Sequence, residues 1–193
     1  DVYRSVYNTV LKAAVKVMNQ AVVERILEFY DRLAIPYNSY TYLCLFMWYG
    51  KTKQLSKIEI LWHELKTQYP QYVTNHIIGS MLTIIRKHKL GKERVNEVLS
   101  FAKHHKIKLE TIEYRELFTI YRDLQDLDSF VALYEDYMTT LSKGLVESHP
   151  HIWDTIIYIY SLLRPRKFLF SQNETKTDKA NFICLFFCSQ PDG

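Results

Sequence analysis

Apolar residues recur at intervals of three and four along most of the chain. Between positions 6 and 33 they fall at Val6, Val10, Leu11, Ala14, Val22, Val23, Ile26, Leu27, Tyr30 and Leu33. This spacing is typical of amphipathic α-helices, in which every third or fourth side chain lies on one face. The polar residues Asn19 and Gln20 interrupt the pattern, and Pro36 and Asn38 follow its end. The pattern therefore predicts two consecutive helices joined by a short turn.

The same arrangement of two amphipathic segments returns three more times. The further pairs are predicted at 42–49 with 55–66, 76–86 with 92–104, and 112–122 with 127–140, and a segment at 152–163 begins a fifth. Aromatic residues stand at corresponding places in the first segments, at Tyr7, Tyr42, Tyr114 and Trp153. A period near 35 residues with two helices per unit is typical of solenoids. We therefore predict an all-α fold, an α-solenoid of stacked antiparallel helix pairs.

The repeating pattern does not extend to the end of the chain. Pro165 predicts the end of the last helix, because proline lacks the backbone N–H that a helix interior needs. We predict a helical repeat domain over residues 1–164, with four units and a partial fifth, and an irregular C-terminal tail over residues 165–193. Asp1 in place of an initiating methionine favours a piece of a longer protein.

Composition narrows the class of protein. Hydrophobic residues make up 48% and charged residues 24% of the 193 residues, values typical of a folded chain. The net charge of +4 is compatible with a polyanionic partner. The three cysteines, Cys44, Cys184 and Cys188, are too few for a disulfide framework, and no nearby histidine completes a metal site. No apolar run approaches the roughly 18 residues that span a bilayer.

Sequence motifs of catalysis are absent from the chain. It contains no glycine-rich phosphate loop and no nucleophile elbow, and its seven histidines show no metal-ligand spacing. We therefore predict that the protein is not an enzyme, that it uses no cofactor or metal, and that it takes no small-molecule substrate.

Three short stretches carry a resemblance to a known family. Residues 6–11 read Val-Tyr-Asn-Thr-Val-Leu, residues 35–38 read Ile-Pro-Tyr-Asn, and residues 107–110 read Ile-Lys-Leu-Glu. The second unit adds Thr41, Tyr42, Lys51, Leu55, Ile58, Leu61, Trp62 and Leu65. With these residues the chain resembles pentatricopeptide repeat proteins, modular RNA binders of organelles, over roughly residues 4 to 163. It departs from the family in the third unit, where the aromatic after Thr74 is missing, and such degenerate units resemble fungal mitochondrial members.

The resemblance implies a function and a location. It implies binding of single-stranded RNA in mitochondrial RNA processing, stability or translation, with the mitochondrial ribosome or other proteins as further partners. The alternative is a protein-binding scaffold of the tetratricopeptide type. That type has a tryptophan-leucine-glycine-tyrosine pattern and small alanines at fixed places, which are not visible here.

The resemblance also implies base-reading positions. It pairs Asn8 with Asn38, and the corresponding positions elsewhere are Leu43, Arg115 and Asp154, with Glu110 closing the third unit. An amide offers a donor and an acceptor, so it can discriminate base edges. An asparagine near a helix start is equally often a cap or a partner of the local backbone. Arg115 and Asp154 fit solvated surface positions as well.

Two further sets of residues are implied to hold the RNA. Ser5, Tyr40 and Ile112 stand where the family sandwiches a base, and stacking on Tyr40 is worth about 1–3 kcal/mol. Tyr40 fits the core between repeats equally well. Lys16 and Lys51 stand near the ends of the first helices, where family lysines meet phosphates. A lysine there also complements the helix dipole.

Overall fold

The computed structural model of the chain describes residues 2–168, and these residues form helices without any β-strand. The prediction of an all-α repeat fold is confirmed. The chain divides into two compact parts, residues 1–152 and residues 153–193. The first part contains four successive helix pairs, which we call the repeat units. The tail predicted over residues 165–193 lies outside the described residues from position 169 onward.

The helices follow one another with short turns. Their bounds are α1 Val2–Val17, α2 Gln20–Arg32, α3 Ser39–Lys51, α4 Leu55–Thr67, the 3₁₀ turn η1 Pro70–Tyr72, α5 Asn75–His88, α6 Lys92–His104, α7 Thr111–Asp123, α8 Leu127–Ser142 and α9 Pro150–Phe168. Non-glycine residues with positive φ, such as Met18, Lys53 and Gln125, end the first helices and turn the chain into the second ones. Each pair is therefore a compact helical hairpin.

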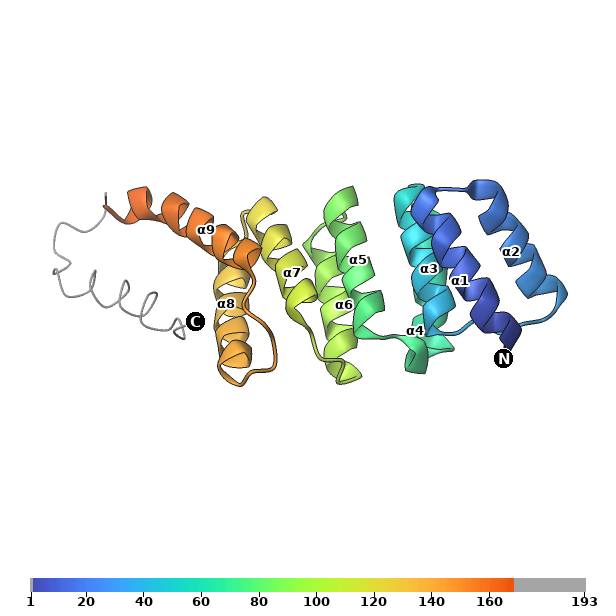
Figure 1. The fold of residues 1–193 in the computed structure, drawn as a ribbon. Coiled ribbons are helices and arrows are strands. Elements are labelled where there is room, and N and C mark those ends of the chain that lie inside the picture. Colours follow the sequence, from blue (N-terminus) through green and yellow to red (C-terminus); the bar gives the residue numbers. More distant parts are fainter. Residues whose placement is uncertain (1, 169–193) are drawn as a thin grey trace. The chain divides into compact units, whose positions relative to one another are not determined.

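The helix pairs are arranged in two layers. The first helices of the pairs, α1, α3, α5 and α7, contact one another in chain order, and each also contacts the second helix of its own pair (Figure 1). We call these four the first-helix layer. Each unit thus packs only against its neighbours in the chain, as in other solenoids. Within the described residues, no helix is both long and apolar enough to cross a membrane.

The repeat period is 36 residues from the second unit onward. The N-caps of α3, α5 and α7 are Asn38, Thr74 and Glu110. This spacing gives the third unit a register, which its own motif residues do not define. Ile78 takes the place of the aromatic there, because it stands 36 residues after Tyr42 and 36 before Tyr114 and is fully buried. We call Tyr7, Tyr42, Ile78 and Tyr114 the anchor residues of the four units.

The tyrosine anchors lie in corresponding surroundings, as the sequence predicts. The hydroxyl of Tyr42 donates to Glu64 Oε1 at 2.7 Å, and the hydroxyl of Tyr114 donates to Asp136. The ring of Tyr7 stacks on Phe29 at 5.7 Å between centroids. Each partner stands 22 residues after its tyrosine, on the second helix of the same unit. The repeat assignment therefore holds at the level of individual contacts.

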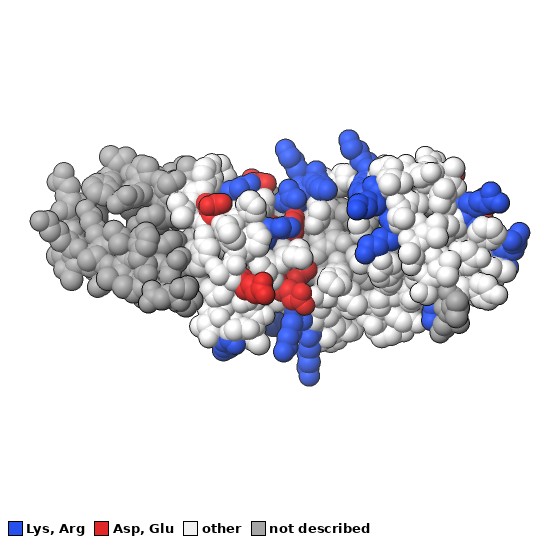
Figure 2. Space-filling model, in the orientation of Figure 1, with Lys and Arg blue, Asp and Glu red and all other residues white. Residues whose placement is uncertain are grey.

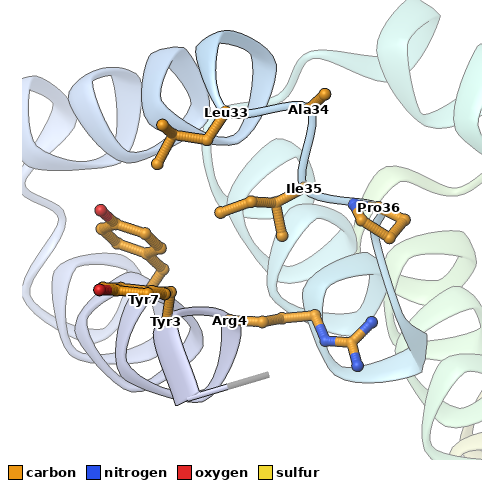
Figure 3. Close-up of a pocket in the computed structure, with 7 residues that line it drawn as sticks. All are labelled: Tyr3, Arg4, Tyr7, Leu33, Ala34, Ile35 and Pro36. Carbon is orange, nitrogen blue, oxygen red and sulfur yellow. The ribbon is translucent and has the colours of Figure 1, made fainter.

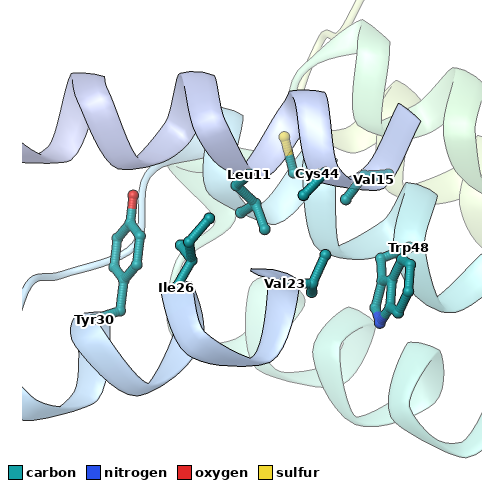
Figure 4. Packing of buried hydrophobic residues seen from close by; sticks show 8 residues of the cluster. Leu11, Val15, Val23, Ile26, Tyr30, Cys44 and Trp48 are labelled. Atoms are coloured by element: carbon teal, nitrogen blue, oxygen red, sulfur yellow. The ribbon is translucent and has the colours of Figure 1, made fainter. Parts of the chain in front are cut away.

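An apolar cluster joins the first two units. Its buried members come from α1, α2 and α3 and interdigitate between these helices (Figure 4): Leu11, Ala14, Val15, Val23, Ile26, Tyr30, Cys44 and Trp48. Removing each large apolar side chain from water stabilises the fold by about 1.5–3 kcal/mol. Because α3 contributes to this cluster, the first unit cannot bury its apolar face without the second.

One boundary predicted from the sequence is wrong. Helix α9 continues past Pro165 to Phe168, so this proline does not end the helix. A proline removes one backbone hydrogen bond and crowds the preceding turn. Three helical residues follow Pro165, so α9 continues for less than one further turn.

Candidate nucleic-acid interface

The first helices of units one to three carry only positive charge. Helices α1, α3 and α5 contain no acidic residue and six basic ones, Arg4, Lys12, Lys16, Lys51, Arg86 and Lys87. The second helices α2, α4 and α6 together contain seven basic and seven acidic residues. The charge of this part of the chain is therefore segregated by layer, and the first-helix layer is its cationic side.

Three exposed lysines occupy the same repeat position. Lys16, Lys51 and Lys87 each stand nine residues after the anchor of their unit, near the end of the first helix. We call these three the lysine row. No ion pair among the described residues engages any of them. Their charges are thus available to an external anion.

The neighbourhood of the lysine row is also basic. Lys53 and Lys89 are exposed in the turns just after α3 and α5. Figure 2 shows Lys and Arg side chains gathered around α5 near the upper edge of the view, whereas Asp and Glu side chains lie around α7. Lys51 additionally donates to the backbone oxygen of Val15 at 3.1 Å, near the end of α1, so it also ties the first two units together.

A second exposed row lies at the start of the first helices. Ser5, Tyr40 and Ile112, the three residues expected to sandwich bases, all stand two residues before an anchor and are exposed. His76 holds this position in the third unit and is exposed as well. Tyr40 lies at the surface and not in the core, with Lys12 Nζ 5.4 Å from its ring centre. The row at the start of the first helices has space for stacked bases, and the lysine row near the ends of these helices has space for phosphates.

Asn8 and Asn38 meet, but inside the protein. Asn8 Nδ2 donates to Asn38 Oδ1 at 3.2 Å, and Asn8 is only 5% exposed. The hydroxyls of Tyr30 and Thr41 both donate to Asn8 Oδ1 at 2.9 Å. Asn38 Oδ1 also accepts the backbone N–H of Thr41 and caps α3. This buried hydrogen-bond network joins α1, α2 and α3, and it occupies most of the hydrogen-bonding capacity of Asn8.

The other expected base-reading positions differ in exposure, and Glu110 and Asp154 are exposed. Leu43 is half-buried, and Gly79 occupies the corresponding place in unit three and is buried. Arg115 is half-buried and donates to the carboxylate of Glu116 at 3.2 Å. Glu110 caps α7 through a capping box with Glu113. Asp154 lies on α9, in the part of the chain formed by residues 153–193, and its side chain is exposed.

The fourth unit differs in charge from the first three. Asp123 stands at the position of the lysine row, and α7 also carries Glu113 and Glu116. Glu113 is 2% exposed, and a Cβ added at Gly79 would lie 2.5 Å from its Oε1, so the carboxyl group contacts the α5 backbone closely. Burial raises the pKa of Glu113 above its ordinary value.

Glu113→Gln is expected to raise the thermal midpoint at pH 7. The amide avoids the cost of a buried charge, and its oxygen can still accept the Glu110 N–H that Glu113 Oε2 accepts at 2.9 Å. Because the folded-state pKa is raised, wild type gains stability as pH falls toward that pKa, and glutamine does not. The advantage of the variant should therefore shrink from pH 7 to pH 5 in thermal unfolding followed by circular dichroism. The exposed Glu135→Gln is the control, and an advantage independent of pH would contradict the assignment.

Lys12 and His76 were not predicted from the sequence, which showed Lys87 only as part of a basic cluster at residues 86–89 and not as a member of the lysine row. The third unit lacks the aromatic of the family, so its lysine had no register there. The signal was the 36-residue spacing between Lys51 and Lys87. In the part of the chain that the structure describes, no group of three histidine, cysteine or carboxylate side chains is placed to hold a metal ion. No protein-family model and no curated protein matches the chain.

Proposed function

We propose that the protein binds single-stranded RNA along the first-helix layer of its first three units. The observation that carries the proposal is the six basic and zero acidic residues of α1, α3 and α5, against the balanced charge of α2, α4 and α6. Neutralising phosphates releases counterions, which is the main source of affinity in protein–nucleic acid binding. Arg86 is held by Glu116 of α7 at 2.7 Å, so the lysines of these adjacent helices are the cations that suit a chain of phosphates.

The exposed aromatic groups favour a single strand over a duplex. Tyr40 and His76 stand at the start of adjacent first helices, on the same layer as the lysine row. Unpaired bases stack on such rings, whereas the bases of a duplex are already stacked on each other. The Lys12 ammonium near the Tyr40 ring adds a cation next to the stacking surface.

The biological setting of the proposal rests on the resemblance to pentatricopeptide repeat proteins. It places the protein in mitochondria, in RNA processing, stability or translation, as a binding protein and not as a catalyst. The repeated tyrosine anchors and the contact between Asn8 and Asn38 support the resemblance.

A binding titration tests the proposal directly. The purified chain is titrated into fluorescently labelled 20-nucleotide RNAs of several sequences, into the same sequence as a duplex, and into an acidic peptide of equal charge. Single strands should bind best, and the logarithm of the association constant should fall against the logarithm of salt with a slope of about −2 to −4, for three to five phosphate contacts. Equal or tighter binding of the peptide would reject RNA as the ligand and favour a tetratricopeptide-like scaffold.

A further inference from the structure

The outer face of α1 is apolar and exposed. Tyr3, Val6, Val10, Ala13 and Val17 follow one another at steps of three and four, so they share one face of the helix. Val6 is 54% and Val10 42% exposed, and Ala13 is also exposed. We call these five residues the apolar stripe. Apolar side chains gathered on one exposed face mark a contact surface more often than scattered ones do.

The same repeat positions are buried in every other unit. Val6, Val10 and Ala13 stand one residue before, three after and six after the anchor Tyr7. The corresponding residues of the three other units are at most 5% exposed: Thr41, Leu45 and Trp48 in α3, Ile77, Met81 and Ile84 in α5, and Glu113, Leu117 and Ile120 in α7. In those units the stripe positions belong to the core.

The preceding first helix accounts for this difference. Helix α3 contacts α1, α5 contacts α3, and α7 contacts α5, in addition to the contact of each with its own second helix. Helix α1 contacts α2 and α3, and within the described residues no helix precedes it. What α1 lacks, relative to the other first helices, is a neighbour on the side of the stripe.

A pocket adjoins the beginning of the stripe. It has a volume of about 540 Å³ and is lined by Tyr3, Arg4, Tyr7 and residues 33–36. Figure 3 shows the rings of Tyr3 and Tyr7 on α1 facing Leu33 and Ile35. In the second unit the rings of Tyr69 and Tyr72 lie within 6.3 Å of the anchor Tyr42. At the place of Tyr69, 27 residues after the anchor, the first unit has Ala34, which lines the pocket and leaves room for an apolar side chain.

We infer that the apolar stripe is the docking surface for one more helix pair of the same repeat type, whose first helix packs on α1 as α1 packs on α3. The interface continues a series that the structure already contains three times at the same positions. A second copy of the chain would instead pair the stripe with itself by two-fold symmetry, a contact that occurs nowhere among the four units. The inference does not depend on RNA binding.

The test extends the chain by one unit. A copy of residues 38–73 replaces residues 1 and 2, which places the copied tyrosine anchor 36 residues before Tyr7. The second unit is copied because α3 packs on α5 through the apolar Ile77, Met81 and Ile84, which correspond to the stripe. Compared with the original chain, the extended chain should show a larger helical signal in circular dichroism and slower amide exchange in α1. Its thermal midpoint should be higher by about 5 °C or more.

A double substitution tests whether the gain in thermal midpoint comes from the apolar stripe. Val6→Glu with Val10→Glu should remove the whole gain in the extended chain, yet shift the midpoint of the original chain by less than about 2 °C, because both residues are exposed there. Ser5→Glu with Ala21→Glu adds the same charges at exposed positions whose counterparts in the second and fourth units are exposed as well, so it should leave the gain in place.

Several outcomes would overturn the inference. They are added helices that stay unfolded, an unchanged midpoint on extension, or an equal effect of the two glutamates with and without the added unit. Sedimentation of the original chain gives a further outcome. A dimer that Val6→Glu with Val10→Glu converts to monomer would assign the stripe to a second copy instead.

Discussion

Replacing Lys16, Lys51 and Lys87 together by alanine is expected to weaken binding of single-stranded RNA about a hundredfold at 0.1 M salt. The three lysines are exposed and have no carboxylate partner among the described residues. Each phosphate contact with a single strand releases about 0.7 counterion, which corresponds to about a fivefold change in affinity at this salt concentration. The slope of the salt dependence should also fall by about 2. Fluorescence anisotropy with labelled RNA measures both quantities.

A matched variant separates position from net charge. Lys57, Lys103 and Lys108 are exposed lysines outside the first-helix layer, and their replacement by alanine changes the net charge by the same amount. This control should lose less than about threefold in affinity, because distant charges are screened at this salt concentration. Equal losses in the two triple variants would show that binding depends on overall charge alone. Circular dichroism checks the fold, since Lys51 also donates to Val15.

Asn8→Ala is expected to lower the free energy of unfolding by about 2–4 kcal/mol. The substitution removes the acceptor at 2.9 Å from the buried hydroxyls of Tyr30 and Thr41. Each unsatisfied buried polar group costs about 1–3 kcal/mol. For a chain of this length the thermal midpoint should fall by roughly 4–16 °C. Urea unfolding gives the free energy, and differential scanning calorimetry gives the midpoint.

The control for Asn8 is its exposed neighbour. Thr9→Ala removes a hydroxyl that donates only to the backbone oxygen of Ser5, so it should change stability by less than about 0.5 kcal/mol. RNA binding of Asn8→Ala is measured well below its thermal midpoint, where the variant is folded. A large loss for one RNA sequence with unchanged stability would contradict the structural role and assign Asn8 to base reading.

Much of the fold could be predicted from local patterns. The predicted segment at 42–49 lies inside α3, which begins earlier because Asn38 and Thr41 form a capping box before the apolar run. The third helix pair was predicted, but its register was not, because its motif is degraded while its helices keep the period. Ile78 fills the place of a tyrosine because that place requires bulk and burial, and an aromatic ring is one way to supply them.

The candidate site was only partly predictable. The sequence could pair Asn8 with Asn38, since both belong to one motif. It could not show that Tyr30 and Thr41 fill the remaining acceptor capacity of Asn8, because that depends on how three helices pack. Charge segregation between the two layers likewise appears only when the helices are assigned to their layers, although every charged residue is visible in the sequence.

Asp123 gives the cationic layer a defined end. A phosphate chain that follows Lys16, Lys51 and Lys87 would next approach a side chain of its own sign at the equivalent point of α7. Asp123 is paired with Arg122 at 2.7 Å, so in the proposed binding mode the fourth unit offers the phosphates no lysine at this point. In the proposed binding mode, the length of RNA held is set by three helices and not by the number of stacked units, so we expect that lengthening the ligand beyond that footprint adds little affinity.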